Sequence, residues 1–218
     1  MSVIRKKTAI FRNRWSLGFY LLVLGLAFVP GCGRPAFLVG IGTGGKYLAA
    51  KEEITRKRGG NIDKAIFNLE TVVRENPTYY DSLTLLGRAY YMKGRYGDAR
   101  LILQRALAVD REDEIAWLVL SMTQLRLGEN EQGLETVQGG LTLFSKVSTE
   151  GYRGYLYWDR AGKVRIALRR AVLLARKGLE EKDNLVRSLE NLLAVIDEEE
   201  WYLRTESTED RRKEFGNP

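Results

Sequence analysis

Apolar residues along most of the chain recur at the three- and four-residue spacing of amphipathic helices. Residues 80–113 show the pattern best, because two apolar runs flank a single glycine. The positions concerned are, in order, Leu83, Leu86, Tyr90, Gly94, Ala99, Leu103 and Ala106. The pattern predicts two helices joined by a tight turn.

Small residues repeat along the chain with a fixed period of 34 positions. One series is Gly60, Gly94, Gly128 and Gly162, and a second, five positions later, is Ala65, Ala99, Gly133 and Ala167. A fixed period of this length is typical of repeat architectures, in which each hairpin buries its apolar face against the next. We therefore expect an all-α fold, an α-solenoid of about four helical hairpins over residues 46–182.

These residues resemble the tetratricopeptide repeat pattern W-x2-L-G-x2-Y…A-x3-F-x2-A…P. Residues 80–113 match it with Leu83 in place of the tryptophan, and Trp117 restores the tryptophan in the next repeat. The resemblance covers roughly residues 46–180 and implies a non-enzymatic scaffold for protein–protein interaction. Gly151 and Gly154 predict a short or irregular first helix in the fourth repeat.

The C-terminal region continues the helical pattern beyond the repeats. Stacked repeats need a terminal cap with one polar face, and residues 183–204 are predicted to form that capping helix. Its apolar positions are Val186, Leu189, Leu193, Ile196 and Leu203. The charged residues 205–218 are predicted to be a disordered tail.

The N-terminal region has the order of a secretory signal: a basic segment, an apolar run over residues 17–29, and then Pro30, Gly31 and Cys32. Residues 29–32 resemble the lipobox of bacterial lipoproteins, which implies a cleaved signal peptide over residues 1–31 and a lipidated Cys32. Residues 32–45, rich in glycine, would form a flexible tether. The alternative is an uncleaved transmembrane helix, because residues 15–33 carry no charge.

Both alternatives place the repeats outside the cytoplasm and tethered to a membrane, since the basic flank stays on the cytoplasmic side. By the same resemblance, Gly33 lacks the aspartate that retains lipoproteins in the inner membrane of enteric bacteria. This favours the outer membrane. The similar layout of tetratricopeptide lipoproteins implies a role in the assembly or biogenesis of an envelope complex. The alternative role is a structural subunit of an inner-membrane complex.

Composition excludes several classes of chemistry. The chain carries 35 Lys+Arg against 28 Asp+Glu, but five of the bases precede residue 32, which leaves 30 − 28 = +2 for the mature chain. That balance gives little basis for nucleic-acid binding. With no histidine and with Cys32 as the only cysteine, we expect no metal site, no cofactor and no catalytic residues.

The family resemblance implies a peptide-binding groove lined by the first helix of each repeat. The corresponding residues here are Lys57, Arg58, Asp81, Thr84, Arg88, Tyr91, Leu118 and Met122. In this hypothesis the cations meet carboxylates of an extended peptide, while Tyr91 and Met122 pack on its side chains.

Two alternatives stay open for this surface. In one, the fourth repeat, around Tyr152, Tyr155 and Trp158, covers the apolar end of the groove. In the other, the protein uses its convex surface, where Tyr157 and its aromatic neighbours would form the centre of an interface.

Overall fold

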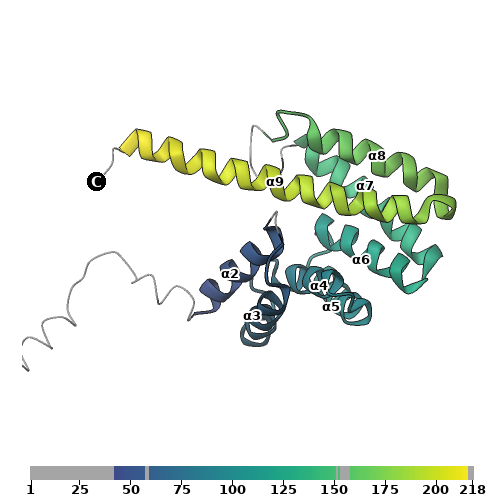
Figure 1. The fold of residues 1–218 in the computed structure, drawn as a ribbon, viewed down its shortest axis with the longest axis horizontal. Helices are drawn as coiled ribbons and strands as arrows, with labels where there is room; N and C mark the ends of the chain where they lie inside the picture. Colours follow the sequence, from purple (N-terminus) through teal and green to yellow (C-terminus); the bar gives the residue numbers. More distant parts are fainter. Residues whose placement is uncertain (1–41, 57–58, 151, 153–157, 216–218) are drawn as a thin grey trace, which may run out of the picture. The chain divides into compact units, whose positions relative to one another are not determined.

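The structure is a computed structural model that describes residues 42–56, 59–150, 152 and 158–215. The chain divides into residues 1–36 and 37–218, and every described residue belongs to the second part. The described residues form helices, with no strand among them, so the all-α fold is confirmed (Figure 1).

Successive helices pair as antiparallel hairpins that stack on one another. The helices are α2 (Thr43–Thr55), α3 (Ile62–Glu75), α4 (Ser82–Met92), α5 (Tyr96–Val109), α6 (Glu114–Leu127) and α7 (Asn130–Glu150). Pairs α2–α3, α4–α5 and α6–α7 are the hairpins, and α3–α4 and α5–α6 join them into an α-solenoid. Then α8 (Lys163–Lys177), the short 3-10 helix η3 (Gly178–Glu181) and the long α9 (Lys182–Phe215) complete the array.

Three glycines of the repeat series adopt the left-handed conformation in the turns before or after helices. Gly94, Gly128 and Gly162 have φ of 73°, 82° and 69°. In the first hairpin the neighbouring Gly59, with φ of 78°, takes this role instead. Gly60 is needed for another reason, because a Cβ there would lie 1.9 Å from the carbonyl oxygen of Glu53. The first member of the series thus permits a close backbone approach.

Small residues within the hairpins let paired helices approach closely. A Cβ on Gly87 would lie 2.5 Å from Cγ of Leu103, and one on Gly133 would lie 2.8 Å from Cδ2 of Leu125. Ala99 is fully buried at the equivalent crossing. Adjacent leucines fill the space that these residues leave, as ridges fill grooves.

Several element boundaries differ from those predicted. The last helix runs from Lys182 to Phe215, whereas the sequence predicted a helix over 183–204 and a disordered tail from 205. Residues 205–215 contain neither glycine nor proline and are rich in helix-forming Glu, Arg and Lys, so the helix continues to the residue before Gly216. Helix α2 begins at Thr43, inside the segment predicted as a tether.

Besides Lys57 and Arg58, two groups of predicted residues lie outside the described residues. One comprises residues 1–41, with the predicted signal segment and Cys32, and the other includes Tyr155 and Tyr157 of the fourth repeat. Over the described ranges within 42–215, no helix combines the length and the apolar character needed to cross a bilayer.

Candidate partner-binding site

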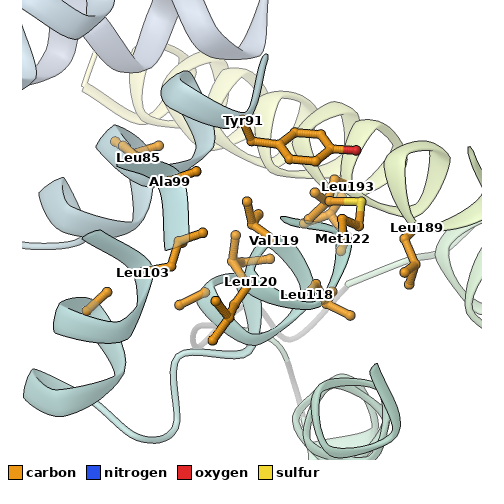
Figure 2. Close-up of a cluster of buried hydrophobic side chains, with 14 of the residues drawn as sticks. Leu85, Tyr91, Ala99, Leu103, Leu118, Val119, Leu120, Met122, Leu189 and Leu193 are labelled. Atoms are coloured by element: carbon orange, nitrogen blue, oxygen red, sulfur yellow. The ribbon is translucent and has the colours of Figure 1, made fainter. Parts of the chain in front are cut away.

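The first helices of the hairpins, α2, α4 and α6, share a surface that we call the first-helix face. Helix α9 lies beside α8 and then crosses α6 on this face (Figure 1). Figure 2 shows Leu193 of α9 beside Met122 of α6. Because the Met122 side chain has no exposed surface, a peptide cannot contact it while α9 is in place.

Polar contacts fix α9 across the neighbouring helix as well. The guanidinium of Arg88 on α4 donates two hydrogen bonds to the carboxylate of Asp197, one of them 2.9 Å long. The hydroxyl of Tyr91 donates to Glu190 at 2.6 Å, and Arg126 of α6 donates to the same carboxylate at 3.4 Å. Burial and the hydrogen bond to Glu190 raise the pKa of Tyr91 well above its ordinary value.

The other end of the first-helix face is hollowed in the part of the chain that the structure describes. A cavity of about 750 Å³ lies where α2, α4 and the turn before α6 meet. Its lining includes Tyr47, Lys51, Tyr80, Asp81, Thr84, Val109, Asp110 and Asp113. We call this space the tyrosine–acid cavity.

Hydrogen bonds hold several of these groups in place. Asp81 accepts a 2.5 Å hydrogen bond from the Tyr47 hydroxyl and lies 3.6 Å from Nζ of Lys51. Asp113 accepts from the Thr84 hydroxyl at 2.5 Å and, through its other oxygen, caps α6 at the amide of Ala116. The lining is therefore preorganised by contacts between successive repeats.

Tyr80 differs from its neighbours in backbone conformation and exposure. Its φ is 47°, and its side chain is 80% exposed beside the cavity. The ring packs on those of Tyr79 and Tyr47, with centroid separations of 4.9 and 5.7 Å. A positive φ is unfavourable for a bulky side chain, and such residues cluster at binding sites.

The predicted groove residues thus fall into three groups. Asp81 and Thr84 line the tyrosine–acid cavity. Arg88, Tyr91 and Met122 lie under or beside α9, and Leu118 is buried near Gly140 of α7. Lys57 and Arg58 lie outside the described residues. Helix α9 covers the apolar end of the face at Met122, and Tyr155 of the fourth repeat, which one alternative placed there, lies outside the described residues. Tyr152 of that repeat is itself buried against Phe144 and Trp158.

Sequence reasoning missed Tyr80 and Asp110, which belong to turns between repeats, and Val109, the last residue of α5; none of them lies in a first helix. Only the repeat register could have drawn attention to them, because these turns approach the first-helix face. No cluster of His, Cys, Asp and Glu suited to a metal ion occurs in the part of the chain that the structure describes.

Comparison with known proteins finds a family similarity in the centre of the chain. Residues 58–123 match the family model described as tetratricopeptide repeat. No curated protein and no solved structure matches the chain. The matched segment covers α3, α4, α5 and most of α6, which contribute the stacked hairpins described above. Residues 58–123 are therefore similar to tetratricopeptide repeats in sequence, and the helices of this segment pack as the stacked hairpins that such repeats form.

Proposed function

We propose that the protein is a non-enzymatic scaffold that binds an extended, basic segment of a partner protein in the tyrosine–acid cavity. The observation that supports this most directly is Tyr80, whose ring is exposed beside an open acidic cavity while its backbone adopts an unfavourable conformation. Tyrosine is favoured at protein interfaces, because its ring gives a large contact area and its hydroxyl can still form hydrogen bonds.

Charge favours a cationic ligand. The cavity is lined by Asp81, Asp110, Asp113 and Glu114, and by Lys51 as its only cation among the described residues. Lys51 already lies near Asp81 and Glu200, at 3.6 and 3.9 Å. The sequence had suggested that the groove meets carboxylates, but Arg88, one of the cations expected to do so, is paired with Asp197.

Binding of short synthetic peptides to the full chain tests this proposal. A fluorescein-labelled peptide of alternating lysine and leucine should raise the anisotropy on titration, whereas a glutamate–leucine peptide of equal length should not. Asp110→Lys should weaken binding of the basic peptide by about tenfold, because it reverses a charge at the cavity. Equal binding of both peptides would contradict the charge assignment.

Tyr80→Gly separates binding from folding. Glycine adopts a positive φ without strain, so unfolding in urea should need at least as much denaturant as in the wild type. Binding of the lysine–leucine peptide should nevertheless weaken by about tenfold, since a central interface aromatic contributes well over 1 kcal/mol. Unchanged affinity would remove Tyr80 from the site.

We also propose that the protein is a lipoprotein tethered through Cys32, with the repeats on the extracytoplasmic side and, more specifically, at the outer membrane. The support is the order of basic, apolar and small residues before Cys32. Intact mass and membrane fractionation of wild type and Cys32→Ser test this. An acylated chain that begins at Cys32 is expected; an unmodified chain that retains Met1 would instead indicate an uncleaved anchor.

A structural subunit of an inner-membrane complex is the second candidate. It is favoured by the exposed aromatic pair Trp201 and Tyr202 on α9, with 55% and 47% exposure and ring centroids 5.2 Å apart. Exposed neighbouring aromatics suit a permanent interface. A stoichiometric complex that survives detergent and is lost in Trp201→Ser would support this candidate.

A further inference from the structure

Helix α8 presents a stripe of alternating apolar and basic side chains to solvent. Every charged residue of α8 is basic. The exposed residues at three- and four-residue spacing are Ile166, Arg169, Arg170, Leu173, Arg176 and Lys177, which we call the α8 stripe. Ile166 and Leu173, two turns apart, are 68% and 60% exposed. We propose that the α8 stripe docks on the surface of an anionic lipid bilayer.

The stripe is free of the packing that holds α8 in the fold. Val164, Ala167, Leu168, Ala171 and Ala175 are the buried residues of α8 and occupy the opposite side of the helix. Helix α8 packs on α7 and α9, so the α8 stripe lies on the side of α8 away from these two helices. The exposed aliphatic side chains of the stripe are therefore available to a partner surface.

The charges of the stripe are available to a ligand. Lys177 lies 3.7 Å from Glu181, but Arg169, Arg170 and Arg176 form no ion pair with any residue that the structure describes. Basic side chains that flank apolar ones on a single helix face are typical of helices that lie in the membrane interface. There the aliphatic groups enter the acyl region, while guanidinium groups bind lipid phosphates.

A hollow beside the stripe has matching chemistry. It lies between α7 and α8, has a volume of about 670 Å³, and includes Leu141, Val172 and Ala175 among its apolar lining residues. Lys146 and Arg176 add two cations to the same lining. An anionic phospholipid carries a phosphate for these cations and an acyl chain for the apolar lining. An acidic protein segment would satisfy the cations but offers less to Ile166 and Leu173.

Photocrosslinking of the full chain in vesicles tests the proposal. p-Benzoylphenylalanine replaces Leu173 or, as a control of similar exposure on α3, Phe67. The proteins are reconstituted in phosphatidylcholine vesicles with and without about 30% phosphatidylglycerol. Position 173 should form lipid adducts in the anionic vesicles and few in phosphatidylcholine alone, while position 67 should form few in either.

Charge variants provide the matched comparison. Neutralising Arg169 and Arg170 to glutamine should reduce the lipid adduct at position 173 by about tenfold, because each base near an anionic surface adds to the attraction. Arg105→Gln with Arg111→Gln changes the net charge equally on exposed residues elsewhere and should leave the adduct unchanged. Equal adducts at positions 67 and 173, or adducts to another protein chain instead of lipid, would overturn the proposal. The assay uses no groove ligand and applies to either form of N-terminal attachment, so it is independent of the proposed function.

Discussion

The ion pair between Arg88 and Asp197 is the most direct probe of how α9 is held on the first-helix face. Their side chains keep 12% and 16% exposure, and they join α4 to α9 across 109 positions of sequence. We therefore consider the single variants Arg88→Ala and Asp197→Ala, and the double variant. Each single change leaves the other charge in a largely desolvated place without its partner.

The exposure of the two side chains sets the expected loss in the free energy of unfolding. Removing one partner of a fully buried pair costs about 3–5 kcal/mol, whereas exposed pairs contribute about 0–1 kcal/mol. A pair with this residual exposure lies between these limits, so each single variant should lower the free energy of unfolding by about 2 kcal/mol. The double variant removes both charges and should lose little more than either single one. This corresponds to a coupling energy of about 1.5 kcal/mol.

Urea unfolding of the four proteins, followed by far-ultraviolet circular dichroism, measures the cycle. Amide hydrogen exchange should also quicken in α9 of each single variant and not in α2 or α3. Glu52→Ala, which removes an exposed partner of Arg56 within α2, is the control and should change stability by about 0.5 kcal/mol or less. Single effects that simply add, to within about 0.4 kcal/mol, would refute the docked position of α9.

Two further predictions concern the repeats themselves. Gly60→Ala should lower the free energy of unfolding by about 1–3 kcal/mol, because its Cβ would meet the carbonyl of Glu53. Gly97→Ala, in a helix where no other atom lies near the added Cβ, should raise the free energy of unfolding by up to about 1 kcal/mol. Comparable urea midpoints for the two variants would contradict the close approach of Gly60 to Glu53. Burial and the hydrogen bond to Glu70 raise the pKa of Tyr90 to about 12, above its ordinary value. The contribution of Tyr90 to stability is therefore complete below about pH 10 and is lost as the pH rises towards 12. Tyr90→Phe should flatten the fall in urea midpoint over that pH range, and an unchanged slope would contradict this prediction.

The sequence predicted the hairpins because their causes are local. Apolar periodicity, the turn glycines and small residues such as Gly87 and Ala99 each act within one repeat. The 34-residue period is therefore enough to predict the solenoid. The family match over residues 58–123 agrees with the part of the chain where this pattern is most regular.

The sequence could not predict which surface α9 would cover. Its apolar positions, Leu189, Leu193 and Ile196, indicate one buried face but not the face on which it packs. The partners of Glu190 and Asp197 stand 99 and 109 positions earlier, and no pattern in the sequence links them. As a result, Arg88 and Tyr91, expected to meet a ligand, contact the chain's own helix. The conformation of Tyr80 was also hidden, because a positive φ is signalled by glycine or asparagine and not by tyrosine.

The central claim is that the tyrosine–acid cavity binds the peptide while α9 stays on the rest of the first-helix face. Amide hydrogen exchange of the full chain, with and without the lysine–leucine peptide, tests this claim most directly. Slower exchange is expected near Tyr80 and Asp110, with no change in α9. Faster exchange in α9 together with protection around Leu118 and Met122 would mean that the peptide displaces α9, which would contradict the account.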